Sequence, residues 1–533
     1  MSLRICYDTQ AVEQFWIMPR HFNTTGPCKP NLHYMLPPTD RLPNLERVVE
    51  QQNYFVIHAP RQTGKTTAML ALAKQLMATQ RYAAVTVSVE VGQPFGADVG
   101  QAELAILEAW RRACRVRLPV ELQLPVGPPA AAGGRIQSAL QEWAIASPLP
   151  LVVLIDEIDS LRDAALLSIL RQLRDGFPDR PEAFPQSIGL IGLRDVRDYK
   201  IAAGGSDSLN TFSPFNIKVQ SLTLRDFNRE EVATLYGQHT TETGQVFSEE
   251  AIDLTFELTQ GQPWLVNALA KEVVEVLLPD SAQTITIAHV QVAKENLIRR
   301  KDTHLDSLAD RLQESRVRSV LEPMMAGLDL GETRDDDRDF LVDLGLLRRD
   351  QGGGLVVANA IYREILPRVL AQGPQDSLPS ISPTWLTAAG GLDVQALRDA
   401  FLAFWIQHGE PLLNSAVYHE IAPHLVMMAF LHRVVNGGGT LEREYAIGRD
   451  RMDLCLRYRT VTLGIELKVQ RDDGRDQVVR GLQQIDRYLA RLDLATGWLV
   501  IFDRRRNALP IETRVRSEIR QTETGRSIEV IYA

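Results

Sequence analysis

The stretch YFVIHAPRQTGKTT, residues 54–67, decides the fold of the first half of this chain. An apolar, β-branched run ends at His58, and a short turn with Gly64 and Lys65 leads into a segment of good helix formers. A Gly-Lys-Thr at a strand-to-helix turn presents backbone N–H groups and the positive end of the helix dipole to an anion. The stretch therefore predicts a strand, a phosphate-binding loop and a helix, in that order.

Each residue of this loop has an expected role. Lys65 is expected to contact the β and γ phosphates of a bound nucleotide, and the Thr66 hydroxyl to bind Mg²⁺. Ala59 stands where the usual pattern has its first glycine, which a small residue tolerates. A Gly-Lys-Thr that only caps a helix, without nucleotide, is the alternative. The predicted nucleotide-binding residues are consecutive: Ala59, Pro60, Arg61, Gln62, Thr63, Gly64, Lys65, Thr66 and Thr67.

A second acidic motif, LVVLIDEIDSL at 151–161, supports the nucleotide site. Asp156 ends a buried strand, where it can hold the hydration shell of the Mg²⁺ ion. Glu157 follows it and can orient the attacking water, so it is the predicted catalytic residue for ATP hydrolysis. Two adjacent carboxylates at the end of a hydrophobic strand are an unusual choice for structure alone.

The regular alternation of apolar runs with helical segments predicts an α/β fold. Near-continuous apolar strands are typical of a parallel sheet that is covered on both faces, and the alternation implies right-handed crossovers. The predicted strands are 53–58, 83–90, 150–155, 187–193 and 216–223. The Pro/Gly/Ala-rich segment 118–135 is expected to be an exposed loop.

The rest of the chain divides by changes in its pattern. Helical periodicity follows residue 225, a Gly-rich turn between two apolar strands suggests a winged helix, and a Pro/Ser-rich segment suggests a linker. We predict an N-terminal arm over 1–50, an ATPase core over 51–225, a helical lid over 226–300, a winged-helix-like unit over 301–372, a linker over 373–392 and a nuclease-like domain over 393–533.

Residues 20–370 resemble P-loop ATPases of the AAA+ and STAND-like group. SIGLIGLRDVRDY at 187–199 is similar to the sensor strand of that group, and TQGQPWLVNALA at 259–270 is similar to the Gly-x-Pro segment of its lid. By this resemblance Arg194 reads the γ-phosphate, although on chemistry alone it could equally form a surface ion pair. A homo-oligomer through the ATPase domain is also implied. Arg171, Arg174 and Arg197 are candidates for an arginine finger.

The C-terminal segments MDLCLRY and VTLGIELKV suggest a second site, from their register. If they form a hairpin that turns at Arg459 and Thr460, Asp453 lies directly opposite Glu466. Like charges in that relation are unfavourable unless a cation lies between them, and two carboxylates suit Mg²⁺. Lys468 shares the face of Glu466 and can orient or deprotonate an attacking water. A solvent-facing strand pair with alternating charges is the alternative.

Helices flank this hairpin. One predicted helix, residues 414–435, carries Glu420 in its early turns, and a later helix places Gln484 and Tyr488 four residues apart on one face. This order resembles PD-(D/E)xK nucleases of the RecB-like group over about residues 395–505, with an α/β restriction-endonuclease-like fold. By that resemblance Asp453 and Glu466 ligate one or two Mg²⁺ ions, for which Mn²⁺ can substitute, Glu420 adds a ligand and Lys468, Gln484 and Tyr488 serve the active site.

Composition is compatible with this prediction. The 533 residues are 45% hydrophobic and 23% charged, with a net charge of −9. Residues 441–533 hold 18 Lys and Arg against 15 Asp and Glu, so binding of a polyanion is expected to be local to that part and sensitive to salt. The four cysteines are far apart, which suits a reducing cytoplasm. Without a long apolar run or a signal pattern, no membrane association is expected.

The sequence thus predicts a cytoplasmic ATPase whose nucleotide state gates Mg²⁺-dependent cleavage of DNA. The resemblance to ATPases fused to such nucleases suggests defence against foreign DNA. A signalling ATPase or scaffold, whose nuclease-like domain binds nucleic acid or a partner without cutting, is the alternative. A translocating motor is less favoured because no second motor domain or basic channel is seen. The winged helix could bind DNA or mediate packing.

Overall fold

The computed structural model describes residues 20–193, 218–279, 282–300, 310–326, 330, 333–350, 352–377, 383–415, 421–435, 439–444, 453–472, 476–505 and 507–533. The chain divides into two compact units. The first comprises the chain up to Arg300 with Asp343–Gly345, and the second comprises Lys301–Val342 and Leu346–Ala533.

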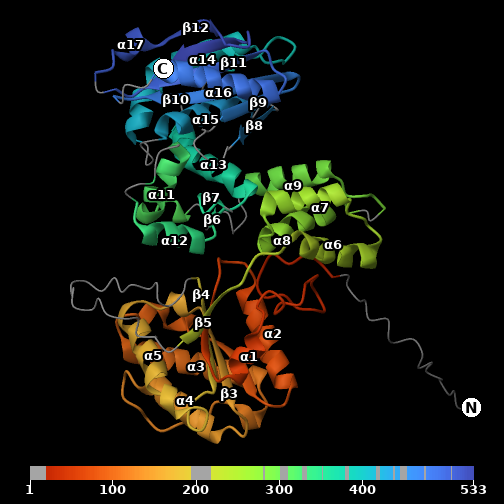
Figure 1. The fold of residues 1–533 in the computed structure, drawn as a ribbon, viewed down its shortest axis with the longest axis vertical. Coiled ribbons are helices and arrows are strands. Elements are labelled where there is room, and N and C mark those ends of the chain that lie inside the picture. Colours follow the sequence, from red (N-terminus) through yellow and green to blue (C-terminus); the bar gives the residue numbers. More distant parts are fainter. Residues whose placement is uncertain are drawn as a thin grey trace, which may run out of the picture. The chain divides into compact units, whose positions relative to one another are not determined.

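The first unit contains a five-stranded parallel sheet in the order β2-β3-β4-β1-β5. Figure 1 labels β3, β4 and β5 of this sheet. Its strands are β1 (Tyr54–His58), β2 (Ala83–Ser88), β3 (Leu151–Asp156), β4 (Ser187–Gly192) and β5 (Lys218–Thr223). The five strands predicted from apolar runs are confirmed. Because the strands are parallel, the phosphate-binding loop after β1 and the acidic motif after β3 emerge at the same edge of the sheet.

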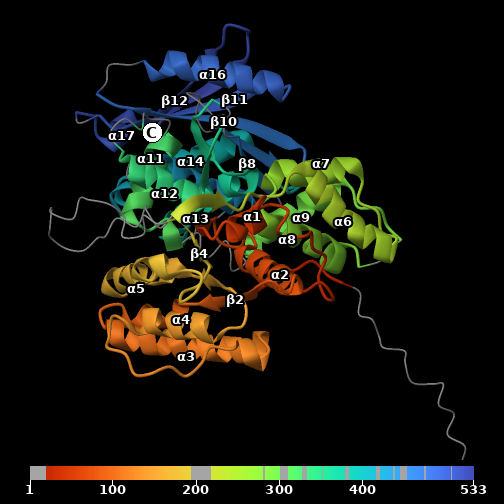
Figure 2. The same cartoon turned by 60° about the horizontal axis from the view of Figure 1, so that its bottom comes forward.

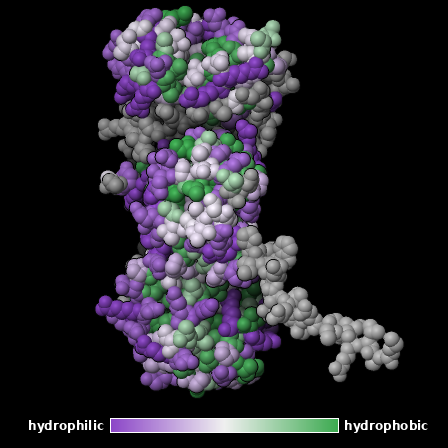
Figure 3. Space-filling view, turned by 90° about the vertical axis from the view of Figure 1, so that its right-hand side faces the viewer, coloured by the Kyte–Doolittle hydropathy of each residue, from purple (hydrophilic) through white to green (hydrophobic). Residues whose placement is uncertain are grey.

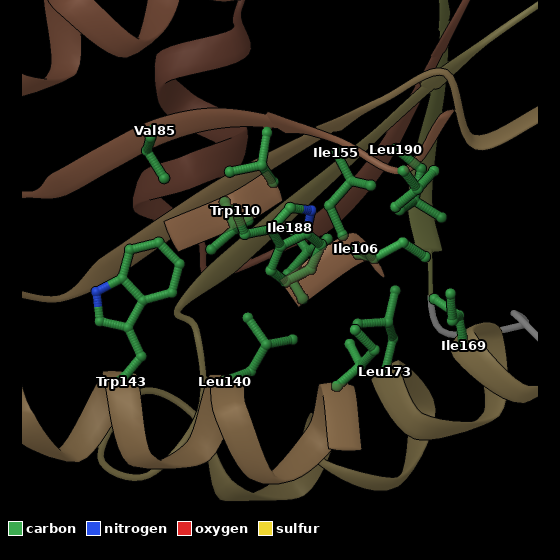
Figure 4. Packing of buried hydrophobic residues seen from close by; sticks show 14 of the residues in the cluster. Val85, Ile106, Trp110, Leu140, Trp143, Ile155, Ile169, Leu173, Ile188 and Leu190 are labelled. Atoms are coloured by element: carbon green, nitrogen blue, oxygen red, sulfur yellow. The ribbon is translucent and has the colours of Figure 1, made fainter. Parts of the chain in front are cut away.

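Helices cover both faces of this sheet, as its apolar strands require (Figure 2). One face packs on α3 (Val99–Arg117), α4 (Arg135–Ala146) and α5 (Asp163–Asp175), and the other on α1 (Leu45–Glu50) and α2 (Lys65–Ala78). Figure 4 shows Trp143 and Leu140 of α4, with Leu173 of α5, facing Ile155 and Ile188 of the sheet. The segment 118–135 is a loop apart from one short 3₁₀ turn, Val120–Leu122.

The helices that were predicted to form a lid follow β5 in the first unit. They are α6 (Arg229–Thr243), α7 (Glu249–Thr259), α8 (Pro263–Lys271), a π-helical segment (Glu272–Leu277) and α9 (Ile287–Arg300). The start of α6 is fixed by a capping box between Asn228 and Glu231. Pro263 occupies the first turn of α8, where its missing N–H costs nothing.

The second unit begins with α11 (Ser315–Ala326), α12 (Asp335–Asp343), the hairpin β6 (Leu347–Arg349) and β7 (Leu355–Val357), and α13 (Ala360–Ser377). The predicted Gly-rich turn is present, with Gly353 at φ 80°. One boundary differs from the prediction. The helix α13 continues through Gly373 and Pro374 into residues that were expected to belong to a linker.

The second unit also contains a mixed six-stranded sheet in the order β12-β13-β11-β10-β9-β8. Its strands are β8 (Gly439–Glu444), β9 (Asp453–Tyr458), β10 (Val461–Gln470), β11 (Thr496–Asp503), β12 (Arg516–Gln521) and β13 (Ser527–Tyr532). Its helices are α14 (Val394–Ser415), α15 (Ala422–Val435), α16 (Gln477–Arg491) and the short α17 (Ile511–Arg514). Trp405 of α14 contacts Phe502 on one face of the sheet, and Tyr488 of α16 packs against Gly464 on the other.

The surface mixes residue types. On the face drawn in Figure 3, hydrophobic residues are interspersed among a majority of hydrophilic ones, which is ordinary because apolar atoms contribute over half of a typical protein surface. Among the described residues, no helix has the length and apolar character needed to cross a bilayer.

Candidate functional site

The phosphate-binding loop joins β1 to α2, which begins at Lys65. Gly64 stands at the N-cap of α2 with φ 93°, a conformation that favours glycine. Thr63 is fully buried, and its hydroxyl donates to the carbonyl of Pro60 at 2.9 Å. The predicted order of strand, loop and helix is confirmed. The loop therefore holds a compact turn at the positive end of a 14-residue helix, the arrangement that binds phosphate in proteins.

The Lys65 ammonium lies within the loop. Its Nζ donates to the carbonyls of Ala59 at 2.7 Å and Pro60 at 2.8 Å. Burial lowers the pKa of Lys65, while the nearby carboxylates of Asp159 and Glu157 act to raise it. Neutral carbonyls are weaker partners for an ammonium than phosphate oxygens are. Lys65 is thus positioned to exchange these contacts for a phosphate.

The two predicted magnesium ligands of this site are in direct contact. The Thr66 hydroxyl of α2 donates to Asp156 Oδ2 of β3 at 2.7 Å. Asp156 is 5% exposed, and its other oxygen accepts the backbone N–H of Glu157 at 3.0 Å. A hydroxyl and a carboxylate are hard oxygen donors, the kind that Mg²⁺ prefers. These residues therefore fit a magnesium ion beside the loop.

Glu157 adopts the left-handed conformation, with φ 57°. Burial and the neighbouring carboxylates of Asp159 and Asp156 raise its pKa, with Lys65 opposing them. A carboxylate whose pKa is raised is a better proton acceptor, which suits a general base. This backbone conformation is uncommon for a residue other than glycine.

Sequence analysis missed Asp159 in this site. Its Oδ1 is buried without a hydrogen-bond partner among the described residues, and it lies 2.9 Å from the position that a Cβ at Gly192 would take. Of the carboxylates that raise the pKa of Lys65, that of Asp159 has the largest effect. Asp159 is the third acidic residue of the sequence Asp156-Glu157-Ile158-Asp159, which could have indicated a role for it. Its position beside Gly192 depends on the turn after β3, which the sequence does not predict.

The predicted sensor could not be placed. Arg194 and Arg197 lie outside the described residues, and β4 ends two residues earlier at Gly192. Arg171 and Arg174 are exposed on α5, and Arg194 remains a proposal.

The parallel sheet and this loop define the first unit. It has the fold of a P-loop ATPase. Among solved structures, the chain is similar to a Walker-type ATPase of Pyrococcus abyssi, at 12% identity and a TM-score of 0.44 over 65% of this chain and 99% of that one. No family model and no curated protein matches it.

Two further solved structures are similar to this chain. The Holliday junction branch migration motor RuvB of Thermotoga maritima matches at 15% identity and a TM-score of 0.33, over 62% of this chain and 93% of that one. Cdc6p of Pyrobaculum aerophilum matches at 11% identity and a TM-score of 0.33, over 61% of this chain and 95% of that one.

The second site rests on the hairpin of β9 and β10. Glu466 is paired with Asp453, and Val461 with Tyr458, so the predicted register is confirmed. The two-residue turn is possible because Arg459 takes φ 52°. The backbone of Asp453 is described, but its side chain is not. The convergence of the two carboxylates therefore stays a prediction.

Glu466 and Lys468 form an ion pair at the centre of this sheet. Their exposed fractions are 1% and 0%, which rules out the alternative of a solvent-facing strand. Alternation along β10 places Gly464, Glu466 and Lys468 on one face. Buried charges of this kind are rare unless paired, and the ion pair brings a carboxylate and an ammonium together inside the domain.

The helix α16 covers the same face. A Cβ at Gly464 would lie 3.0 Å from the ring of Tyr488, so glycine allows the ring to lie directly on the strand. Gln484 Oε1 and Tyr488 Oη are both buried atoms. The predicted pair on α16 is therefore on the helix face that packs against β10 and β11. Cys455 is buried in that same cluster.

Glu420 lies outside the described residues, so the metal ligand expected there stays a prediction. Of the helix expected over 414–435, the described residues at its start belong to the end of α14, and the later ones form α15 from Ala422 to Val435. Among the side chains that are described, no three His, Cys, Asp or Glu residues form a group that could hold a metal.

Sequence analysis also missed two charged groups beside the phosphate-binding loop, buried Arg41 and half-buried Asp226, which act on each other electrostatically. Arg41 is 6% exposed, and burial lowers its pKa to about 10. Burial raises the pKa of Asp226 to about 6, against the pull of Arg41. The Oδ1 atom of Asp226 is buried, without a hydrogen-bond partner in the described part of the chain.

Asp226→Asn should change how stability depends on pH. Because the native pKa is raised above the ordinary value of about 3.9, the native state holds more protons between about pH 4 and 6, and stability falls as pH rises through that window. The asparagine variant escapes this loss. Its free energy of unfolding relative to wild type should rise by up to about 3 kcal/mol from pH 4 to 6 and then stay level. Urea titrations at several pH values would measure it, and a difference independent of pH would contradict the raised pKa.

Proposed function

We propose that the first unit binds and hydrolyses ATP. The supporting observation is the phosphate-binding loop, with Lys65 inside it and Thr66 bonded to Asp156. Backbone N–H groups of the loop would bind the phosphates, Thr66 and Asp156 would hold Mg²⁺, and the ion would neutralise charge on the phosphates. Glu157 would accept the proton of the attacking water, and Arg194 would contact the γ-phosphate.

We also propose that the second unit cleaves the phosphodiester backbone of DNA. The observation that carries this is the register of Asp453 against Glu466, with Lys468 paired to Glu466 in the interior. Both acids supply hard oxygen donors, so one or two Mg²⁺ or Mn²⁺ ions would be held there and would stabilise charge on the phosphate. Lys468 would orient the attacking water. Gln484 and Tyr488 would support the site from α16, and Glu420 would add a ligand.

The presence of both units in one chain suggests that the first regulates the second. The nucleotide state of the P-loop would gate cleavage, and the ATPase unit would form a homo-oligomer with nucleic acid as its partner. A role in defence against foreign DNA follows only from the resemblance to fused ATPase nucleases.

The nuclease proposal predicts metal-dependent cutting. Purified protein with Mg²⁺ should nick plasmid DNA, and Asp453→Asn should lower the rate by about 10²-fold or more, because it removes a charged ligand while keeping the shape. Arg520→Met alters only an exposed ion pair on β12 and should cut like wild type. Gel analysis of plasmid forms, with and without a chelator, gives the rates.

The same assay separates the alternative. If the wild-type protein shifts DNA in a binding assay but leaves plasmid intact with Mg²⁺ and with Mn²⁺, the second unit is a binding module in a signalling ATPase. Equal cutting by wild type and Asp453→Asn would show that the activity comes from another site or a contaminant.

A further inference from the structure

Arg41 joins two parts of the first unit that are distant in sequence. One nitrogen, Nη2, donates to the carbonyl of Thr63 in the phosphate-binding loop at 3.0 Å. The other, Nη1, donates to the carbonyl of Arg225 at 2.9 Å. The guanidinium also lies over the ring of Phe227, 4.8 Å from its centroid. A planar fork is suited to hold two acceptors at once.

Arg41 Nη2 contacts the Thr63–Gly64 peptide unit, whose N–H would bind phosphate. The Thr63 carbonyl and the Gly64 N–H belong to one planar peptide unit, so they move together. A charged donor on the carbonyl polarises that unit and strengthens the N–H as a donor. Contact is close, because a Cβ at Gly64 would lie 3.0 Å from Arg41 Nη2. A shift of this peptide on binding phosphate must therefore act on Arg41.

The other end of the Arg41 guanidinium lies at the hinge of the lid, which we define as Arg225–Phe227 between β5 and α6. The Arg225 guanidinium forms two hydrogen bonds to Glu231 of α6, at 2.6 and 2.8 Å. The Phe227 N–H donates to Gly261 before α8 at 2.9 Å. A Cβ at Gly261 would lie 1.8 Å from the Phe227 carbonyl oxygen, so these two segments pack backbone against backbone. The hinge is tied to both α6 and α8.

We propose that Arg41 is a positioning residue that couples the phosphate-binding loop to the hinge, so that nucleotide at the loop changes the state of the lid. The inference rests on the proposed nucleotide binding. Leu42 anchors the arm beside Arg41, since it is 3% exposed in a core cluster with Ala59 of the loop and Leu224 at the end of β5. A shift at the loop is then passed to the hinge through the guanidinium.

Hydrogen–deuterium exchange tests this, with a slowly hydrolysed ATP analogue and Mg²⁺ at saturation. In wild type, amides of the loop and α2 and amides of α6–α8 should both exchange more slowly with nucleotide, the lid amides by about tenfold. In Arg41→Met the loop and α2 should still be protected, but the lid response should fall to within twofold. Arg41→Lys should keep part of the response. Arg47→Met, at an exposed position of α1, should match wild type.

The outcomes separate coupling from structure and from binding. An unchanged lid response in Arg41→Met, or a wild-type lid that ignores nucleotide while the loop is protected, overturns the proposal. If neither loop nor lid responds in wild type, nucleotide binding itself fails. If Arg41→Met does not fold, Arg41→Lys and Phe227→Leu decide, because the first replaces the two-nitrogen guanidinium by a single ammonium and the second removes the aromatic ring beneath the guanidinium. A smaller lid response in them supports coupling, and a full one overturns it.

Discussion

Lys65→Ala should weaken nucleotide binding strongly. The variant removes the ammonium that the loop holds against the Ala59 and Pro60 carbonyls. Loss of one partner of a desolvated charge pair costs about 2–5 kcal/mol, or roughly 30- to 5000-fold in Kd. Isothermal titration with ATP and Mg²⁺ measures the change directly.

A matched variant separates binding from hydrolysis. Glu157→Gln keeps the size of the side chain but removes the proton acceptor, so the Kd for ATP should change little. Phosphate release should fall by about 10²- to 10⁴-fold, the usual contribution of a general base. Tight ATP binding by Lys65→Ala would show that the loop is only a helix cap.

Lys468→Met should destabilise the second unit more than other single changes in its sheet. Glu466 would lose its ammonium partner in an interior where the two are 1% and 0% exposed. Breaking a buried pair on one side costs about 3–5 kcal/mol, whereas replacing both members by apolar residues is often neutral. Glu466→Leu combined with Lys468→Met should therefore recover most of the stability while remaining inactive in cleavage.

Denaturant unfolding of the three proteins checks this, with Arg520→Met as the control. Arg520 pairs with Glu518 on the exposed face of β12, and surface pairs contribute little. If Lys468→Met unfolds at the same denaturant concentration as wild type, the ion pair contributes nothing and Lys468 can be assigned to function alone.

Local sequence patterns correctly predicted the strands of the parallel sheet and the register of the hairpin that holds Asp453 and Glu466. Continuous apolar runs located the five parallel strands, because a strand that is buried on both faces cannot alternate. The register of β9 with β10 followed from the two-residue turn, although Arg459 must adopt a conformation that favours glycine. In both cases the information lies within a few residues of the feature that it predicts.

Contacts between distant segments could not be predicted. Arg41 meets the Arg225 carbonyl across 184 residues, and no periodicity in the arm indicates that it is buried. The helix α13 continues through Gly373 and Pro374, two residues that normally suggest a break. Local preference did not decide the structure there, and only the fold as a whole brings Asp159 close enough to act on the pKa of Lys65.

The coupling of the two activities is tested most directly by the rate of Mg²⁺-dependent plasmid nicking, measured with and without ATP in wild type, Lys65→Ala and Asp453→Asn. ATP should change the wild-type rate and should leave the Lys65→Ala rate unchanged. With or without ATP, Asp453→Asn should nick at least about 10²-fold more slowly than wild type. Equal rates for wild type and Lys65→Ala under both conditions would contradict nucleotide gating, and undiminished nicking by Asp453→Asn would contradict the proposed cleavage site.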